Sequence, residues 1–174
     1  MSREAMAQHH QEIVTAGARL LRERGIEGLS VADLMQAAGL THGGFYRHFA
    51  SKDAFVREAI AAAFASIEEM RNGWRGTPME QLITCTEQYL SEMHVAQPGM
   101  GCPTAAFAGE MVRASEETQT VFMDGFLGIT DWIAKRLEGD EKHRRERAAQ
   151  IMTTMVGAVI AARASGNSEG GVQI

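Results

Sequence analysis

Hydrophobic residues recur every three or four positions along most of this chain, which is the spacing of one buried helix face. The first run of this kind predicts a helix from about Ala7 to Arg24, and Gly25 is well suited to end it. Its predicted buried stripe consists of Ile13, Ala16, Leu20 and Leu21. Alternating runs of β-branched residues, which would indicate strands, are absent from the sequence. The pattern therefore predicts an all-α protein.

Two short helices are predicted next, on either side of a glycine turn. Ser30 is suited to cap a helix over Val31–Ala38, which Gly39 ends. Thr41 is suited to cap a third helix, over about His42–Phe49. Two short helices joined by such a tight turn form a helix-turn-helix, whose second helix enters the major groove of DNA. The alternative is an exposed helical hairpin within a larger bundle, with no role in DNA binding.

Longer helices are predicted beyond residue 50. Ser51 is suited to cap one that begins at Lys52–Asp53 and continues past Glu69. The capping box Thr77-Pro78-Met79-Glu80 then starts a fifth helix, which is predicted to reach about Val95. Three further helices are predicted over about Pro103–Ala114, Glu116–Leu137 and Glu141–Ala164.

These elements divide the chain into three parts. Residues 1–50 are predicted to form a three-helix, helix-turn-helix DNA-binding domain, and residues 51–165 a larger all-helical domain. The long fourth helix is predicted to join the two. Residues 166–174 are mostly small and polar, so we expect a flexible tail there.

The charge of the chain is divided unevenly between these parts. The net charge is −5, but residues 1–57 hold seven of the 17 Lys+Arg and six of the 22 Asp+Glu. The N-terminal part is therefore weakly basic, and the acidic excess lies in the remainder. The net charge alone neither supports nor excludes binding to nucleic acid.

The composition disfavours several classes of protein. Two cysteines, Cys85 and Cys102, are too few for a disulfide framework, and no apolar run approaches the ~20 residues of a membrane span. The first residues lack the apolar core of a secretory signal, so we expect a cytoplasmic protein without membrane contact. No nucleophile–base pair or carboxylate dyad indicates an enzyme. His94 and His143 lack a metal-ligating partner four residues on, so we expect solvated side chains, no metal and no cofactor.

The third predicted helix has an unusual composition. Gly43 and Gly44 each cost roughly 1 kcal/mol relative to alanine inside a helix, but small residues let the backbone approach base edges. Hydrogen-bond donors follow one and two turns later, where DNA phosphates would lie. These donors are Tyr46, Arg47, His48 and Lys52. We expect Phe45 and Phe49 in the core instead.

Residues 13–60 resemble the N-terminal domain of TetR-family transcriptional regulators. The matching motifs are Ala16 with Leu20-Leu21, Gly25-x-x-Gly28-Leu29-Ser30-Val31, Ala37-Ala38-Gly39-Leu40 and Phe45-Tyr46-Arg47-His48-Phe49-x-Ser51-Lys52-Asp53. The resemblance implies a regulator, generally a repressor, that binds a palindromic DNA operator as a homodimer and is released by a ligand. It also implies that residues 51–165 bind the ligand and dimerise. The alternative is a helical interaction module.

The resemblance also implies roles for single residues. Ser30, Tyr46 and His48 would contact phosphates, and Lys52 would anchor a phosphate at the start of the fourth helix. The base-reading face would consist of Thr41, His42, Gly43 and Gly44, with His42 the best single candidate for reading a base.

The last two predicted helices carry long apolar stripes. These are Val121, Phe122, Phe126, Ile129, Ile133 and Leu137 on the first helix, and Ile151, Met155, Val159 and Ile160 on the second. The resemblance implies that they form a four-helix dimer interface. Intramolecular core is the alternative, and both hold if the helices pack inward as well as across.

The segment Gly101-Cys102-Pro103 resembles the start of a helix in one branch of the family, some of whose members respond to electrophiles. A thiol at a helix N-terminus is favoured as a thiolate by the helix dipole. DNA binding controlled by modification of Cys102 is therefore one hypothesis, and a small residue beside the cap is the simpler alternative. Cys85 is expected to be inert core.

Methionine and aromatic side chains of the second half are suited to line an adaptable apolar pocket, although at helical spacing such residues are more often core. The candidate sensing residues are Trp74, Cys102, Phe107 and Met111. Besides double-stranded DNA, the expected partner is a small apolar or electrophilic effector.

Overall fold

The computed structural model describes residues 3–39 and 42–166, and over this range the chain is helical without strands. The α-helices are α1 (Arg3–Arg24), α2 (Val31–Ala37), α3 (His42–His48), α4 (Lys52–Asn72), α5 (Pro78–Tyr89), α6 (Glu92–Ala96), α7 (Pro103–Phe107), α8 (Glu116–Ala134) and α9 (Glu141–Ser165). Two 3-10 turns, η1 (Pro98–Met100) and η2 (Met111–Arg113), lie among them. The predicted all-α fold is confirmed. The predicted tail lies outside the described residues, except for Gly166.

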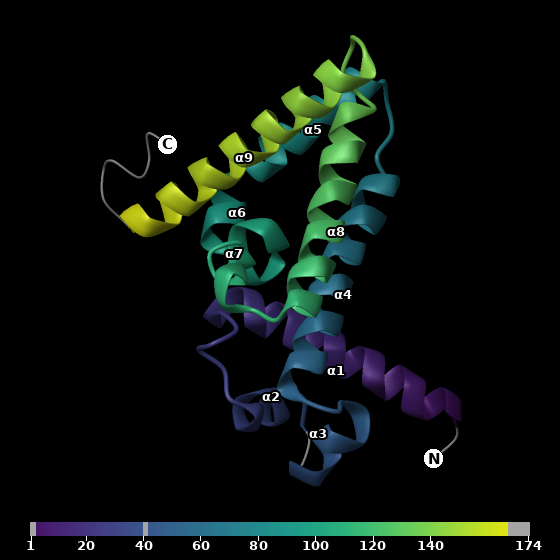
Figure 1. The fold of residues 1–174 in the computed structure, drawn as a ribbon, viewed down its shortest axis with the longest axis vertical. Helices are drawn as coiled ribbons and strands as arrows, with labels where there is room; N and C mark the ends of the chain where they lie inside the picture. Colours follow the sequence, from purple (N-terminus) through teal and green to yellow (C-terminus); the bar gives the residue numbers. More distant parts are fainter. Residues whose placement is uncertain (1–2, 40–41, 167–174) are drawn as a thin grey trace.

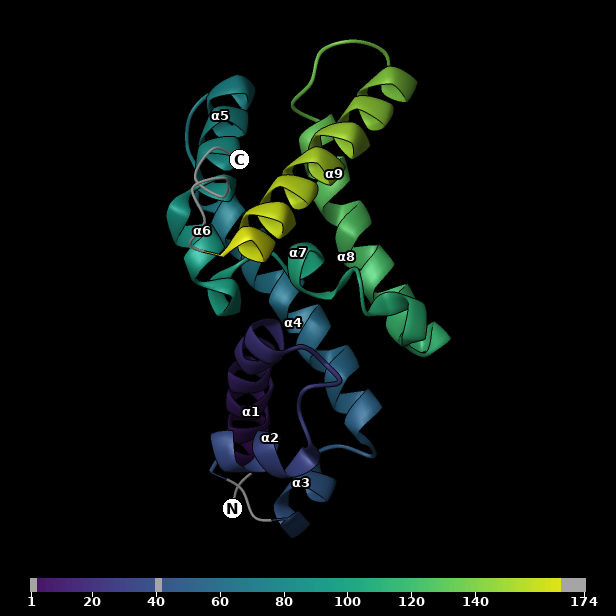
Figure 2. The same ribbon diagram turned by 90° about the vertical axis from the view of Figure 1, so that its left-hand side faces the viewer.

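The molecule is elongated, and α4 runs along it. Figures 1 and 2 show α2 and α3 at one end and the connection between α8 and α9 at the other. Helix α1 crosses α4 and also packs against η1 and α7, so it contacts both halves of the chain. No helix in residues 3–39 or 42–166 is long and apolar enough to cross a membrane.

Helix α1 buries a different stripe from the predicted one. Ile13 and Leu21 are buried as expected, but Ala16 is exposed. The face toward α4 includes Gly17, which has no side chain and so leaves room for the ring of Phe55. The predicted stripe followed the larger side chains, whereas the observed stripe includes Gly17 because the ring of Phe55 packs closely against it.

Local capping signals were predicted correctly. Ser30 accepts a hydrogen bond from the backbone of Asp33 in a capping box, and Thr77 and Glu80 form a second box at the start of α5. The hydroxyl of Ser51 likewise caps α4. Glycines 25 and 39 have φ angles of +79° and +65°, as expected where a helix ends in the left-handed region. Thr41, the third predicted cap, lies outside the described residues.

Three of the longer predicted helices extend too far. The helix expected to reach Val95 ends at Tyr89, because Ser91 caps a new helix, α6, by accepting a hydrogen bond from the backbone of His94. The helix expected to reach Ala114 ends at Phe107, two residues before a helix-disfavouring glycine, and η2 follows. The helix predicted over about Glu116–Leu137 is α8, which ends three residues earlier, at Ala134.

The apolar stripes of α8 and α9 belong largely to the core of the single chain. Six of the predicted interface residues are buried here: Phe122, Ile129, Ile133, Leu137, Met155 and Val159. Ile160 is 43% exposed, together with Met123 at 45% and Leu127 at 51% on α8. The inward stripe is therefore intramolecular, and apolar side chains remain on the outside.

Candidate nucleic-acid interface and internal pocket

Helix α3 has one buried and one exposed face. Phe45 and Phe49, one turn apart, are 0% and 2% exposed, which confirms their place in the core. Both rings contact Phe55 at the start of α4, with centroid distances of 5.7 and 5.0 Å. Tyr46 and Arg47 consequently face outward, and Tyr46 is 52% exposed. The aromatic cluster fixes α3 against α4 and leaves its polar side available.

The predicted base-reading residues belong to the segment that enters α3. Helix α3 begins at His42, so Gly43 and Gly44 form its first turn. Thr41 and the side chain of His42 lie outside the described part of the chain, and their roles stay predictions. Gly44 is half-buried.

His48 lies between α3 and α1 rather than on the outer face. Its ring is 5.4 Å from the ring of His9 and 5.6 Å from that of His10. Burial, followed by the two neighbouring histidines, lowers the pKa of His48. We therefore expect a neutral imidazole near pH 7, so any contact of His48 with a DNA phosphate would be that of a hydrogen-bond donor and not of a cation.

Two other predicted phosphate ligands already have partners within the chain. The backbone N–H and the hydroxyl of Ser30 both donate to the Asp33 carboxylate, and these bonds lower the pKa of Asp33. The ammonium of Lys52 donates to the carbonyl of Ile26 at 2.7 Å. That bond occupies one of three ammonium donors and ties the start of α4 to the loop before α2.

Residues in and next to η2 also contact this loop. The carboxylate of Glu110 accepts hydrogen bonds from the backbone of Ile26 at 2.8 Å and of Glu27 at 3.2 Å. Arg113 makes an ion pair with Glu27 at 2.9 Å. These contacts join residues more than 80 positions apart. Nothing in the local sequence indicates them.

A second set of polar contacts fixes the first turn of α4 to α8. Asp53 accepts hydrogen bonds from the hydroxyls of Ser115 and Thr118, and Thr118 is 1% exposed. Asp53 also pairs with Arg57 one turn along α4. The end of α4 nearest the helix-turn-helix is thus tied to the domain that follows it.

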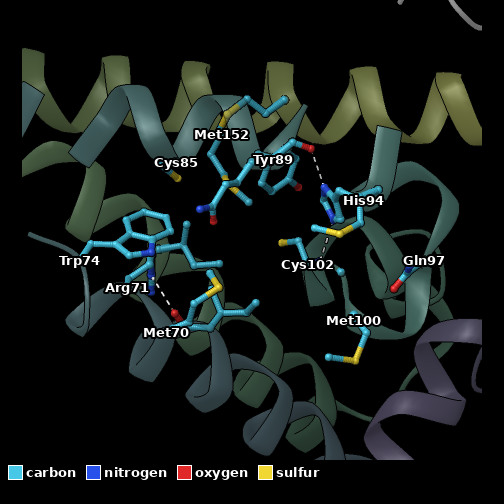
Figure 3. A pocket seen from close by; sticks show the side chains of 16 residues that line it. Met70, Arg71, Trp74, Cys85, Tyr89, His94, Gln97, Met100, Cys102 and Met152 are labelled. Atoms are coloured by element: carbon cyan, nitrogen blue, oxygen red, sulfur yellow. Dashed lines mark hydrogen bonds between the residues drawn. The ribbon is translucent and has the colours of Figure 1, made fainter. Parts of the chain in front are cut away.

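A pocket of about 320 Å³ lies between α4, α5, α6, α8 and α9. Trp74 and Cys102, two of the four predicted sensing residues, line it. Five methionines also contribute to the wall: Met70, Met93, Met100, Met152 and Met155. Figure 3 shows Trp74 and Arg71 on one side of the cavity and His94 on the other.

The other two predicted sensing residues lie outside this pocket. Phe107 is 0% exposed and packs in the core, because the short helix α7 contacts α1, α4 and α9. Met111 is 7% exposed in η2, where its carbonyl accepts a hydrogen bond from Gln119. The prediction followed residue type, whereas the crossing of the helices determines which side chains meet the cavity.

His94 is a structural part of the pocket wall and not a solvated side chain, which corrects the expectation from sequence. It is 9% exposed. Its Nδ1 lies 2.6 Å from the carbonyl oxygen of Tyr89, and its Nε2 accepts a bond of 2.9 Å from the backbone N–H of Cys102. Since a carbonyl only accepts and an N–H only donates, Nδ1 carries the proton and the ring is neutral. Burial accordingly lowers the pKa of His94. His143 is exposed, as predicted, and contacts Asp140.

The two cysteines are free and line the same pocket. Cys102 is 5% exposed and occupies the N-cap of α7, a helix of only five residues. Burial raises the pKa of the half-buried Cys85 thiol, and burial together with nearby Cys102 raises the pKa of Tyr89. Among residues 3–39 and 42–166, no group of three or more His, Cys, Asp or Glu side chains is placed to hold a metal ion.

Comparison with known families accounts for both halves of the chain. Residues 13–59 match the bacterial regulatory proteins of the tetR family. Residues 78–170, more than half of the chain, match the C-terminal domain of LmrA/YxaF-like transcriptional regulators. The chain belongs to the TetR family. The helix-turn-helix formed by α2 and α3 is therefore the DNA-binding element of a transcriptional regulator, as predicted.

Relatives of this TetR-family regulator are themselves transcriptional repressors. The repressor NemR of Escherichia coli (strain K12) is 25% identical over 138 residues, which cover 76% of this chain and 69% of NemR. The repressor DhaR of Mycobacterium sp. (strain GP1) is 27% identical over 120 residues, covering 69% of this chain and 59% of DhaR. These relatives are regulators and not enzymes.

Solved structures share the fold of the TetR-family chain. The reduced form of E. coli NemR superposes with a TM-score of 0.80 at 20% identity, covering 95% of this chain and 92% of NemR. A TetR-family regulator from Agrobacterium tumefaciens gives a TM-score of 0.79 at 22% identity, over 92% and 90% of the two chains. The likeness extends over both the helix-turn-helix and the helical domain.

Proposed function

We propose that this regulator is a cytoplasmic repressor that binds a palindromic operator as a homodimer and leaves it when a small molecule occupies the internal pocket. The observation that carries this proposal is the course of α4. Its first turn contacts α3 through Phe55, and its last turns supply Ile67, Met70 and Arg71 to the pocket wall. With 21 residues, α4 is about 30 Å long at 1.5 Å per residue.

A displacement of α4 by a ligand would reach the DNA-binding end without an intermediate. A dimer that reads two half-sites needs its recognition helices about 34–36 Å apart, and a small change of this spacing prevents both from entering the major groove. The bond that Lys52 donates to Ile26 and the bond that Asp53 accepts from Ser115 anchor the first turn of α4, so they would limit how far it moves.

The DNA contacts we propose combine the segment that enters α3 with the exposed residues Tyr46 and Arg47. His42 would read a base, with the adjacent backbone kept close by its small neighbours, and Tyr46 and Arg47 would contact phosphates. The flanking phosphate contacts would come from Ser30 and Lys52. Thr41, Gly43, Gly44 and His48 complete the proposed interface.

The proposed dimer uses the outer sides of α8 and α9. Met123 and Leu127, one turn apart on α8, are about half-exposed, as is Ile160 on α9. Within the described part of the chain, a methyl group at Gly128 or Gly157 on the same helices would meet no packed neighbour within 4 Å, so a partner helix would be able to approach closely there. Large apolar side chains left exposed beside such open glycines favour a helical partner.

Selection of binding sites from a random duplex pool, followed by fluorescence anisotropy at several salt concentrations, tests the DNA-binding part. We expect a palindromic site, and Lys52→Ala should flatten the log–log salt slope by about one unit. Lys142→Ala, which removes an exposed lysine at the start of α9, should leave the slope unchanged. Failure to enrich any sequence, or binding as a monomer, would contradict the proposal.

A second candidate for release is covalent modification of Cys102, because its thiol lines the pocket that an electrophile would enter. In this step the thiolate adds to a ring carbon of a quinone, and the ring takes up a proton as the C–S bond forms. Treatment with 1,4-benzoquinone should add one quinone to Cys102 and lower the affinity for operator DNA, while Cys102→Ser should be resistant. An unmodified Cys102, or modification with unchanged DNA binding, would remove this candidate.

A further inference from the structure

Arg71 is a buried cation without an anionic partner in the described part of the chain. It is 5% exposed, and its Nη1 atom is buried with no hydrogen-bond acceptor among those residues. Its Nε donates to the carbonyl of Ile67 at 3.3 Å, one turn back on α4. Glu68 lies nearby on the same helix but is exposed and makes no ion pair with Arg71. Burial lowers the pKa of Arg71, although arginine remains protonated at neutral pH.

An unpaired charge in this position is costly. Charged side chains are rarely buried unless they are paired, because transfer from water is only offset by an opposite charge and its hydrogen bonds. The ring of Trp132, 5.1 Å from the guanidinium carbon, offers a cation–π contact but no acceptor for Nη1. Arg136 stacks on the same ring at 3.5 Å and adds a second positive charge nearby.

The pocket that Arg71 lines is apolar and offers this cation no carboxylate partner among the described residues. None of the described residues that line it is an aspartate or a glutamate, and His94 in the opposite wall is neutral. Most of the remaining wall is methionine, isoleucine and tryptophan. An apolar cavity with one buried positive group near one end suits a ligand with an apolar body and an anionic head.

We propose that this pocket takes a small organic carboxylate, whose charged group pairs with Arg71 and whose aromatic or branched body contacts the methionines. The inference rests on the proposed function, since it names the class of effector for that pocket. A guanidinium presents parallel N–H donors that match the two oxygens of a carboxylate. The volume of about 320 Å³ is at the small end of ligand pockets and favours a molecule of one or two rings.

The position of Arg71 also connects such a ligand to DNA binding. Arg71 belongs to the last turn of α4, whereas the opposite wall belongs to α6, α9 and the residues before α7. A carboxylate held by Arg71 with its body against Met152 and Met155 therefore bridges α4 to α9. That bridge would set the position of α4 relative to the rest of the helical domain.

Isothermal titration calorimetry with pairs of acids and their neutral amides tests the proposal on the full-length protein at pH 7.5. The probes are benzoate, 4-phenylbutyrate and 2-naphthoate with the corresponding amides, which have nearly the same shape without the charge. At least one acid should bind at least about 10-fold more tightly than its amide. Arg71→Met should weaken that acid by roughly 30-fold or more and leave the amide within about two-fold.

Two further variants serve as controls. Arg75→Met removes an exposed arginine four residues away and should behave as the unchanged protein. Arg71→Lys keeps the charge and should retain part of the preference for the acid. The proposal is overturned if no acid binds, if acids and amides bind equally, or if Arg71→Met keeps the preference.

A stability measurement separates ligand recognition from a merely structural role. Because an uncompensated buried charge destabilises the folded state, Arg71→Met without ligand should unfold at the same or a higher urea concentration. A clear fall in that midpoint would mark Arg71 as structural and overturn the proposal. An acid that binds through Arg71 but leaves operator DNA bound would support this inference and contradict the release step of the proposed function.

Discussion

The contact between Gly17 and Phe55 predicts how sensitive the DNA-binding domain is to a single methyl group. A Cβ atom at residue 17 would lie 2.0 Å from the Cζ atom of Phe55, whereas carbon atoms in contact are normally about 3.5–4.0 Å apart. The ring has little freedom to move away, because Phe55 is 0% exposed and contacts both Phe45 and Phe49. Gly17→Ala therefore forces α1 and α4 apart or displaces the aromatic cluster.

Two opposing effects set the size of the change. Alanine is about 1 kcal/mol better than glycine inside a helix, which favours the variant. Overpacking a well-filled core costs roughly 1–3 kcal/mol and sometimes more. An overlap of this depth against a fully buried ring belongs at or above the upper end of that range, so the overpacking term is the larger one. We expect a net loss of about 2 kcal/mol or more in the free energy of unfolding.

Urea unfolding followed by circular dichroism measures this loss, and anisotropy with operator DNA measures its effect on α3. Phe45 and Phe49 belong to or adjoin α3, so a displaced cluster should also weaken DNA binding. The double variant Gly17→Ala with Phe55→Leu should recover part of the stability, because the smaller side chain vacates the space that the methyl group needs. A single variant Gly17→Ala as stable as the parent protein would refute the packing argument.

Three further predictions follow from particular contacts. Burial lowers the pKa of His94 in the folded state. Below the ordinary histidine pKa of about 6.5, the unfolded state therefore binds a proton that the folded state does not. The free energy of unfolding should fall as the pH is lowered below that value, and it should fall less steeply in His94→Gln. An equal slope in the two proteins would contradict this. Ser30→Ala removes the cap of α2 and should lower the free energy of unfolding by about 1 kcal/mol, while Ser66→Ala within α4 should change little. Leu127→Asp should shift the protein from dimer to monomer in analytical ultracentrifugation, and an unchanged dimer would place the interface elsewhere.

The parts of the fold that were predictable depend on interactions within three or four residues. The caps at Ser30, Ser51 and Thr77 each join a side chain to a backbone N–H three positions later, so residue type and spacing contain the information. The break at Tyr89 was missed although Ser91 carries the same signal. Apolar spacing continues through Leu90 and hides the break, because periodicity does not depend on whether the backbone bonds continue.

The candidate site was less accessible to sequence reasoning, because its contacts depend on how the helices cross. His94 bonds to the backbone of Cys102, and Glu110 bonds to a loop 84 residues earlier. Arg71 and Arg75 are arginines four positions apart, yet Arg71 is buried in the pocket wall and Arg75 is exposed. Only the three-dimensional path of α4 beside α8 distinguishes them.

Thermodynamic linkage constrains how the two ends of α4 communicate. If a carboxylate bound at Arg71 weakens operator binding by some factor, the operator must weaken carboxylate binding by the same factor. A ligand that bound the DNA-free and DNA-bound forms equally would release nothing, however tightly it bound. The geometry offers a source of that difference, because Arg71 moves with α4 while Met152 and Met155 belong to α9. The distance between the charged and apolar ends of the pocket therefore changes when α4 moves, and a ligand of fixed length fits one position of α4 better than the other.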